Sequence, residues 1–490
     1  MANLSIVYEI NTRVWLRELS LKYRRDIKLG QVPEEEFNDL RKSGFDAIWL
    51  MGVWLSSKRG REIVLEHQQL RDEFLRVLPD LKPEDIACSP YAIAAYEIDP
   101  LLGGGKGAAA FRKRAHKHGM KLFLDFVPNH LALDHPWIKT HPEYFINGTA
   151  QEMSDNPDMF FRAGDEAILA HGKDPYFPAW TDVAQLNYFN PETAKAMRRE
   201  LLKVVSWCDG VRCDMAMLIL KEIQKKIWGE KVFRGDEFKE PGSEFWQEAI
   251  LKVKKSYPEF IFIAEAYWGL EAELISLGFD YAYDKSFYDQ LKETRIRDVK
   301  TGLSESSEWT DNKLRFIENH DEPRAATVFG DEKSKAAALI MVLASGAHLF
   351  HQGQMEGFKI RLPIQLLRRP PEEVNPGIRS FYETLLSHLK TLIHSESRWI
   401  LLDSTCDNFV ALFNGRGYLA IINYSDAPSQ GYAHLDLPDI RSKNLLFKDL
   451  LGPAQYSRAS EEIASAGLYL DLMPYGFHLF KITGEDDQNA

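Results

Sequence analysis

The chain has 490 residues, 45% of them hydrophobic, which is enough for a large core divided among two or three domains. Its 72 acidic and 60 basic side chains give a formal net charge of −12, which argues against nucleic acid or a membrane as a partner, because both favour clustered Lys and Arg. The four cysteines form no CxxC pair, which argues against a zinc site. The sequence shows neither a signal-peptide pattern nor an apolar run of ~18 residues, which predicts a cytoplasmic protein.

Short runs that are apolar on both faces, as buried parallel strands are, alternate with longer amphipathic stretches. The runs predict strands at 5–10, 46–53, 121–127, 210–216, 260–268, 279–284, 314–319 and 347–353. Two of the helical patterns between them have clear ends. One occupies 108–119 and stops at Gly119, and the other begins with Asn190 as its cap and Pro191 in its first turn. Eight strands with intervening helices predict an α/β fold, a (β/α)8 barrel.

Two segments are too long for a simple strand–helix connection. Residues 54–90 contain a charged helical stretch at 60–78, and residues 128–190 are rich in His, Pro, Asn and aromatics. Both follow the carboxyl end of a predicted strand, where barrel enzymes build their active sites. From about residue 396 alternating segments predict a separate antiparallel β-sandwich.

These observations predict the domain organisation of the whole chain. The barrel comprises 1–127, with the insertion at 54–90, and 191–395; an inserted domain B after the third strand comprises 128–190; a β-sandwich domain comprises 396–484, and a tail 485–490.

Carboxylates interrupt or end several of the predicted strands, namely Asp125, Asp214, Glu265 and Asp321. A buried carboxylate is costly unless it is paired or functional. A single one is as often a paired structural acid as a functional group. Four of them, each toward the carboxyl end of a strand, predict one shared site. The intervals of 51 residues from Asp214 to Glu265 and 56 from Glu265 to Asp321 fit one long and two compact barrel units.

Convergent carboxylates near aromatic side chains indicate glycosidic bond chemistry. One carboxyl stays ionised and attacks the anomeric carbon, while the other protonates the leaving oxygen. Arg212 lies two positions before Asp214, on the same side of the strand, so that its charge would keep Asp214 ionised. The alternative for Arg212 is a plain structural ion pair.

Four segments together resemble the α-amylase superfamily, family thirteen of the glycoside hydrolases. In order along the chain they are DFVPNH at 125–130, GVRCDMA at 210–216, FIAEAY at 262–267 and FIENHD at 316–321. The resemblance covers residues 6–390. It implies that Asp214 is the nucleophile, that Glu265 is the general acid/base, and that Asp321 stabilises the transition state.

The resemblance also implies a set of substrate-binding residues. Arg212 would position Asp214, His130 and His320 would bind sugar hydroxyls, and Asp125 and Asn129 would brace the site. Tyr91 would stack on the sugar ring, with Tyr96 as the alternative. Trp268, just past Glu265, is a candidate for an acceptor subsite.

Many members of this superfamily bind structural calcium through the Asn of the first segment and a His shortly after the second. Here Asn129 is present, but the later position falls near Leu218, without a histidine, and Gln185 stands where relatives often have an acid. We therefore expect no metal and no cofactor.

The predicted function is a retaining glycoside hydrolase that acts on α-1,4-glucans or maltooligosaccharides, with the Asp214 and Glu265 carboxyls about 5–5.5 Å apart. The alternatives are a transglycosylase or sugar phosphorylase on the same barrel and a catalytically silent carbohydrate-binding protein. An unrelated metal-dependent lyase is a further alternative, against which the lack of a His/Asp cluster argues.

Overall fold

The computed structural model describes residues 4–164, 167–235, 237–305, 309–393, 398–435 and 442–485. The chain divides into two compact units: residues 1–41, 46–283 and 362–371 form the first, and 42–45, 284–361 and 372–490 the second. Within the described ranges, no helix has both the length and the apolar character needed to cross a bilayer.

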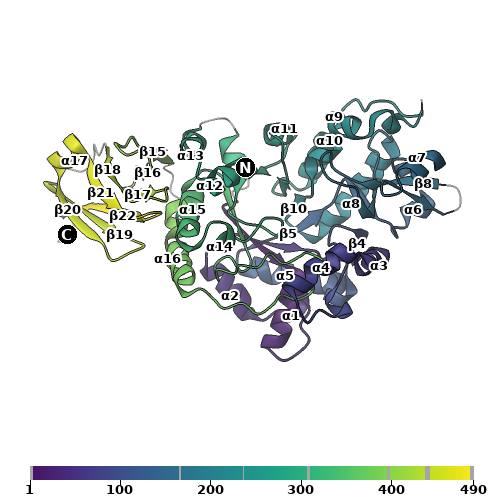
Figure 1. The fold of residues 1–490 in the computed structure, drawn as a ribbon, viewed down its shortest axis with the longest axis horizontal. Coiled ribbons are helices and arrows are strands. Elements are labelled where there is room, and N and C mark those ends of the chain that lie inside the picture. The colour runs from purple at the N-terminus through teal and green to yellow at the C-terminus, as the bar shows by residue number, and fades with distance from the viewer. Residues whose placement is uncertain are drawn as a thin grey trace. The chain divides into compact units, whose positions relative to one another are not determined.

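Eight parallel strands close into a barrel in the order β1-β14-β13-β12-β11-β10-β5-β2. They are β1 (Ile6–Asn11), β2 (Ala47–Met51), β5 (Lys121–Phe126), β10 (Gly210–Cys213), β11 (Ile261–Ala264), β12 (Tyr281–Tyr283), β13 (Lys313–Arg315) and β14 (Ala347–His351). Two of them, β5 and β10, are labelled in Figure 1. Each predicted run supplies one of these strands, so the predicted (β/α)8 barrel is confirmed.

Several strands end earlier than the apolar runs suggest. β10 stops at Cys213, β11 at Ala264 and β13 at Arg315, so Asp214, Glu265 and Asp321 follow their strands, and of the four acids only Asp125 lies inside one. The runs continue past the hydrogen-bonded ladder because the segments beyond it are buried too, as Ala216 to Leu220 are after β10.

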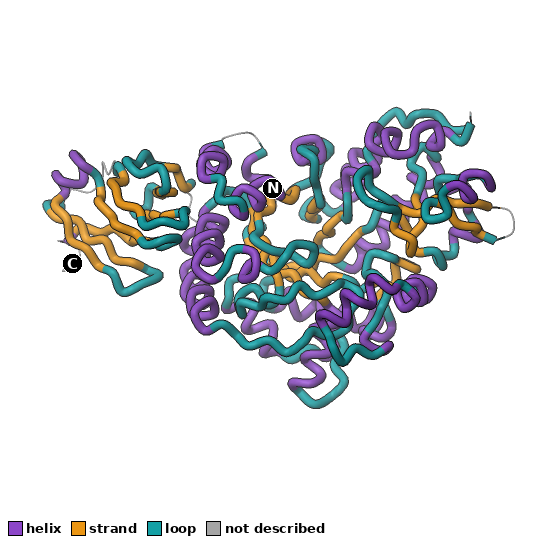
Figure 2. The backbone as a smooth tube through the Cα atoms, in the orientation of Figure 1, coloured by secondary structure: helices purple, strands orange, loops and turns teal. Residues whose placement is uncertain are grey.

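Helices alternate with the barrel strands, as Figure 2 shows in purple and orange. Those between or after barrel strands are α1 (Thr12–Lys22), α2 (Glu34–Lys42), α5 (Gly104–Lys117), α8 (Pro191–Trp207), α9 (Lys221–Trp228), α10 (Phe245–Ser256), α11 (Glu271–Ser276), α12 (Lys285–Lys292), α13 (Ile296–Ser304), α14 (Ala325–Val328), α15 (Asp331–Leu343) and α16 (Pro376–Ile393). Both helices with predicted ends are present. The Asn190 side chain caps α8 by accepting the Glu192 N–H at 2.9 Å, and Gly119 adopts a φ of 70° just past α5.

The insertion at 54–90 forms β3 (Trp54–Ser56), α3 (Lys58–Glu66) and α4 (Gln68–Val77), and β4 (Ile93–Ile98) follows and pairs with β3. The charged stretch predicted as helical at 60–78 is therefore two helices. His67 separates them because its backbone is extended, at φ −80° and ψ 102°, and its ring accepts the Leu70 N–H as the cap of α4. Val64, Phe74 and Ile86 form the core of this insertion.

The predicted insertion after the third barrel strand is an antiparallel sheet in the order β6-β9-β8-β7. Its strands are β6 (His130–Ala132), β7 (Phe160–Ala163), β8 (Ala167–Gly172) and β9 (Trp180–Gln185), and α6 (Trp137–Thr140) and α7 (Ala150–Asp155) lie between β6 and β7. One face packs in a core of Ile146, Phe160, Ile168 and Ala170 with Trp228, which belongs to α9 after strand β10.

The carboxy-terminal residues form two antiparallel sheets around one apolar core, as predicted. The larger sheet has the order β15-β16-β17-β22-β19-β20 and the smaller one pairs β18 with β21. The elements are β15 (Trp399–Leu401), β16 (Phe409–Asn414), β17 (Tyr418–Asn423), β18 (Ser429–Ala433), β19 (Asn444–Asp449), β20 (Gln455–Ala459), α17 (Ser460–Ala466), β21 (Leu468–Leu472) and β22 (Phe477–Gly484). The domain boundaries stay predictions, and beyond residue 485 the predicted tail lies outside the described residues.

Buried histidines in the inserted domain predict a loss of stability in acid. Burial lowers the pKa of His135 from 6.5 to about 4, with Asp134 opposing the shift and Lys203 adding to it; burial also lowers the pKa of His130 and of His171. Between pH 6.5 and 4 the unfolded chain therefore binds more protons than the folded one, so the free energy of unfolding falls as the pH drops through that window.

At 1.36 kcal/mol per pKa unit, His135 alone contributes about 3 kcal/mol of this loss. Replacement by asparagine, which can still accept the Trp137 N–H that His135 Nδ1 accepts at 3.2 Å, should reduce the loss between pH 7 and pH 4.5. Urea unfolding at the two pH values measures it. The same loss in both proteins would contradict this assignment.

Candidate active site

The register of three barrel strands positions the candidate catalytic residues. Arg212 in β10 lies opposite Asp125 in β5 and Ile263 in β11. Side chains alternate along a strand, so Arg212 and Asp214 point to the same side. The ladder continues one residue past the strand ends, where the Asp214 N–H donates to the Phe126 carbonyl at 2.9 Å and the Glu265 N–H to the Cys213 carbonyl at 3.0 Å. Asp214 and Glu265 therefore stand side by side.

The Arg212 guanidinium, only 1% exposed, holds both of these carboxylates. Its Nη1 lies 2.6 Å from Asp214 Oδ1 and 3.9 Å from Asp125 Oδ1, and its Nη2 lies 2.9 Å from Glu265 Oε1. Burial by itself would lower the pKa of Arg212, but the charge of Glu265, with smaller contributions from Asp214 and nearby tyrosines, raises it well above its ordinary value. The cation is therefore permanent and balances the buried carboxylates.

Three aromatic rings surround this cation. The rings of Trp49, Tyr91 and Tyr283 lie 5.3, 5.2 and 5.7 Å from the guanidinium carbon, within the range of cation–π attraction. Tyr91 is therefore at the candidate site. Its alternative, Tyr96, lies in the core instead, where its hydroxyl exchanges hydrogen bonds with the Val127 backbone at 2.9 Å.

Glu265 accepts hydrogen bonds from two groups that the sequence did not single out. The Tyr267 hydroxyl donates to Oε1 at 2.9 Å, and the Met215 N–H donates to Oε2 at 2.5 Å. Met215 has φ 42° and ψ 48°, the left-handed region, which is uncommon for a residue with a long side chain and is associated with functional sites. Tyr267, two positions after Glu265, could have been found from strand periodicity, but nothing in the sequence marks Met215.

Asp125 braces the base of the site. Its carboxylate accepts the Trp49 indole N–H and the Gly52 N–H, both at 3.2 Å, and its carbonyl accepts the Trp54 indole N–H at 2.8 Å. These bonds connect β5 with β2 and the segment that follows it.

Asn129 and His130 lie where the inserted sheet leaves the barrel. The Asn129 side-chain oxygen accepts a hydrogen bond from the Gln185 amide at 2.8 Å, and its own amide donates to Gln185 Oε1 at 3.2 Å. His130 is buried beside the Trp180 ring, with 5.2 Å between centroids, and burial lowers its pKa despite the charge of Asp214. His130 is therefore a neutral imidazole, suited to hydrogen bonds with hydroxyl groups.

Asn129 and Leu218 do not fit the calcium site that was considered from the sequence. Asn129 is paired with an amide rather than a carboxylate, and Leu218 is apolar and buried. Across the described ranges, no group of three or more His, Cys, Asp or Glu side chains is arranged to hold a metal ion.

His320 and Asp321 belong to the second unit and follow β13. Asn319 Oδ1 accepts the N–H groups of Asp321 and Glu322, both at 2.9 Å, and His320 Nε2 lies 3.0 Å from Asp321 Oδ2. The side chain of Asp321 is 43% exposed, whereas that of His320 is buried. Their roles stay predictions.

A second carboxylate in this segment was missed from the sequence. Glu318 is buried, and its Oε2 accepts a hydrogen bond from the Ala325 N–H at 2.7 Å. Its Oε1 lies 3.0 Å from Arg324 Nη1 and 3.3 Å from His351 Nδ1. These contacts connect the segment after β13 with α14 and the end of β14.

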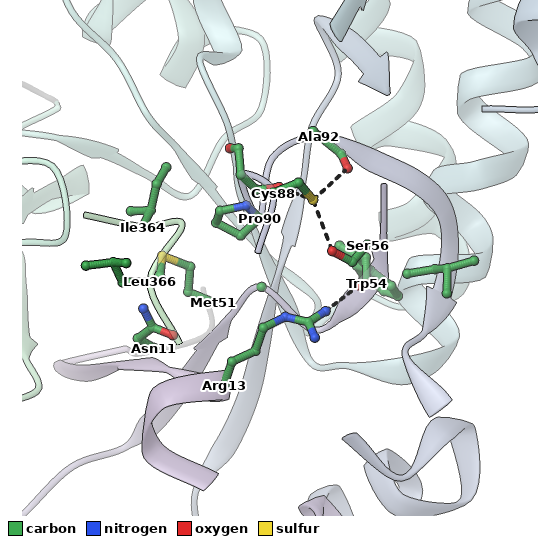
Figure 3. A pocket seen from close by; sticks show the side chains of 13 residues that line it. Asn11, Arg13, Met51, Trp54, Ser56, Cys88, Pro90, Ala92, Ile364 and Leu366 are labelled. Carbon is green, nitrogen blue, oxygen red and sulfur yellow. Dashed lines mark hydrogen bonds between the residues drawn. The ribbon is translucent and has the colours of Figure 1, made fainter. Parts of the chain in front are cut away.

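A small cavity opens beside the ends of β1 and β2, lined by Asn11, Met51 and Leu366 among others (Figure 3). Its volume of about 10 Å³ holds about one water molecule, far less than a sugar ring. Cys88 borders it, with Sγ 3.0 Å from the Ser56 hydroxyl, and burial raises the pKa of this thiol. The cavity is therefore a packing feature, and Cys88 is an unreactive thiol.

Comparison with known proteins decides the family. A family model described as the α-amylase catalytic domain matches residues 35–364. The chain belongs to the α-amylase family. That range includes Asp125, Arg212, Asp214, Glu265 and Asp321.

Individual relatives of this α-amylase-family chain differ in what they are named for. The chain is 22% identical over 316 residues to α-amylase 3 of Dictyoglomus thermophilum, and the match covers 59% of this chain and 57% of the relative. It is 27% identical over 171 residues to an α-1,4-glucan:maltose-1-phosphate maltosyltransferase of Bifidobacterium animalis, covering 35% of this chain and 18% of the relative. The chain thus spans less than two thirds of either protein.

Solved structures agree with the fold over nearly the whole chain. One is an α-amylase from Geobacillus thermoleovorans complexed with acarbose, with a TM-score of 0.65 at 18% identity over 98% of both chains. At this identity the match supports the fold alone.

Proposed function

We propose that this α-amylase-family chain cleaves α-glucosidic bonds of α-1,4-glucans or maltooligosaccharides with retention of configuration. The observation that carries the proposal is the pair of carboxylates, Asp214 and Glu265, held on adjacent strand ends by the two terminal nitrogens of one buried arginine. Carboxyls bound to the same guanidinium are close neighbours, which favours the separation of about 5–5.5 Å used by retaining enzymes over the 6.5–9.5 Å of inverting ones.

In the first step an Asp214 oxygen bonds to the anomeric carbon of the sugar. The bond from that carbon to the leaving oxygen breaks, and Glu265, which must carry a proton at this stage, transfers it to the leaving oxygen. The product of the step is a glycosyl ester of Asp214. Arg212 holds and orients the Asp214 carboxylate before the attack through the hydrogen bond from its Nη1.

In the second step Glu265 removes a proton from water while the water oxygen bonds to the anomeric carbon and the ester bond to Asp214 breaks. The hydrogen bonds that Glu265 accepts from Tyr267 and Met215 suit its ionised form, which is the form needed as the base. A sugar hydroxyl in place of water gives transfer, and phosphate gives phosphorolysis. The maltosyltransferase among the relatives keeps transfer as the second candidate.

Under this proposal His130 binds a hydroxyl of the sugar in the cleaved position, because burial keeps its ring neutral and it follows β5, the strand that pairs with β10 before Asp214. Tyr91, over the Arg212 guanidinium, provides the aromatic face for that sugar. Asp321 is proposed as the third carboxylate, which stabilises the transition state.

Product analysis tests the proposal. The protein should shorten maltoheptaose, and the newly formed reducing ends should appear first as the α-anomer in proton NMR spectra. Sucrose and trehalose, offered separately, test other linkages. The β-anomer appearing first would overturn retention, and intact maltoheptaose after prolonged incubation would overturn the proposed substrate.

The same experiment separates water from other acceptors. Hydrolysis gives only shorter products, transfer gives products longer than maltoheptaose, and added phosphate raises the rate and gives a sugar phosphate only in a phosphorylase. Asp214→Asn serves as the control, because any product that this variant still forms comes from a contaminating enzyme.

A further inference from the structure

A buried ion pair closes the turn that carries Asp321. Glu318 and Arg324 stand three residues before and three residues after Asp321, and their side chains are 1% and 3% exposed. Glu318 Oε1 lies 3.0 Å from Arg324 Nη1, and Glu318 Oε2 accepts the N–H of Ala325, the first residue of α14, at 2.7 Å. A helix cannot satisfy its own first N–H groups, so this one carboxylate holds both a side chain and a backbone group at the far end of the turn.

Arg324 also fastens the turn to the segment that follows β14. Its Nη2 donates to the Gln352 carbonyl at 3.0 Å, and its Nη1 lies 2.7 Å from His351 Nδ1. From the same segment, Arg361 Nη1 donates to the Asp321 carbonyl at 2.9 Å. The turn is therefore held both at its end and at Asp321 itself.

The purpose of this buried pair is geometric. An ion pair inside a protein adds little net stability, because the cost of removing both charges from water offsets their attraction. It does fix the relative position of the two groups, since either charge left alone in the interior is strongly unfavourable. A group that stabilises a transition state needs such fixed placement, because a shift of about 1 Å can cost roughly 10²-fold in rate.

We propose that Glu318 and Arg324 are positioning residues for Asp321: their ion pair sets the shape of the turn and so places the Asp321 carboxylate against the sugar. This inference rests on the proposed function, in which Asp321 stabilises the transition state. Both side chains act through Asp321 and do not contact the substrate.

The kinetic constants of two single variants test the positioning. Glu318→Gln keeps the shape of the side chain but removes its charge, and Arg324→Met removes the opposite charge. Each should lower kcat for α-glucosyl fluoride roughly tenfold and change KM less than about threefold, because the misplaced group acts in the transition state. An unchanged kcat in both variants, or a loss confined to KM, would overturn the proposal.

A double-mutant cycle separates positioning from general damage. If Glu318 acts through Asp321, its charge should no longer matter once the Asp321 carboxylate is gone. In the Asp321→Asn background, Glu318→Gln should therefore lower kcat less than about twofold. The reactive fluoride leaving group keeps this residual rate measurable. A tenfold loss in both backgrounds would show that the two residues act independently and would contradict the positioning role.

The matched control is Asp99→Asn, in the first unit. Asp99 is 2% exposed, and like Glu318 it makes two contacts: its Oδ2 lies 2.8 Å from Arg13 Nη2 and its Oδ1 accepts the Leu101 N–H at 2.8 Å. This variant should lower the urea midpoint of unfolding, as Glu318→Gln does, and leave kcat within about twofold of the wild type. A tenfold loss of kcat here would show that disrupting any buried ion pair is enough, and the proposal would fall.

Amide hydrogen exchange, measured by mass spectrometry, distinguishes failure of the positioning from failure of the proposed function, because it needs no turnover. The N–H groups of Asp321 and Glu322 donate to Asn319 and not to Glu318, so their exchange reports the shape of the turn. Glu318→Gln should speed it roughly tenfold, and Asp99→Asn should leave it unchanged. If the wild type cleaves neither α-glucosyl fluoride nor maltoheptaose but Glu318→Gln still speeds the exchange, the proposed function fails and the control of the turn stands. Unchanged exchange in Glu318→Gln overturns the positioning itself.

Discussion

Replacement of Asp214 by glycine is expected to lower the rate of α-glucosyl fluoride cleavage roughly 10⁴-fold or more, and sodium azide is expected to restore part of it as β-glucosyl azide. Without the carboxylate no glycosyl ester forms. The space it leaves admits a small anion, held beside the Arg212 cation, which attacks the same face of the anomeric carbon. Initial rates and the anomer of the azide product, determined by NMR, measure the effect.

Glu265→Ala is expected to give the other anomer of the azide product in the same assay. Fluoride leaves without a strong acid, so the ester to Asp214 still forms, and azide then attacks this intermediate from the other face to give α-glucosyl azide. Asp80→Asn, at an exposed carboxylate, should leave the rate unchanged and give no azide product beyond that of the wild type. The same azide anomer from both active-site variants would contradict the assignment of roles.

The barrel could be predicted from the sequence because its strands are buried on both faces. A run such as AIWLM in β2 has no polar position to obscure it, and all five residues are buried. The short strands of the inserted sheet were not predicted individually, since three to six residues with mixed polarity carry no clear period. His67 shows a further limit: the apolar pattern continues on both sides of it, although the helix does not.

In the candidate site, too, the contacts that follow from residue spacing could be predicted, whereas those that follow from strand register or backbone conformation could not. Arg212 and Asp214 could be assigned to one side of a strand from their spacing alone. In the structure Arg212 Nη1 lies 2.6 Å from Asp214 Oδ1. The ion pair between Arg212 and Glu265 depends on the register of β10 and β11, which the sequence does not contain. The hydrogen bond from the Met215 N–H to Glu265 depends on a left-handed backbone conformation at Met215. A glycine or asparagine at this position would have suggested that conformation, but a methionine does not.

Arg212→Met is expected to lower both stability and activity strongly. The guanidinium is fully buried and neutralises Asp214 and Glu265, so its removal leaves two carboxylates without their cation inside the barrel. Removal of one partner from a buried pair costs about 3–5 kcal/mol. At neutral pH we expect a loss of that size in the free energy of unfolding, and a decrease in kcat of roughly 10²-fold or more because Asp214 is no longer oriented.

The pH dependence of the stability of Arg212→Met distinguishes the effect of the lost charge from the effect of lost packing. Without the cation, the ionised Asp214 and Glu265 repel each other inside the barrel and have no buried positive charge to offset them. The difference in stability from the wild type should therefore be smallest in acid and grow as the pH rises toward neutral. Arg59→Met, which breaks an exposed pair with Glu62, should cost less than about 1 kcal/mol at every pH. If Arg212→Met showed a deficit that did not change with pH, the arginine would act through its shape, and the charge balance that supports the catalytic assignment would be wrong.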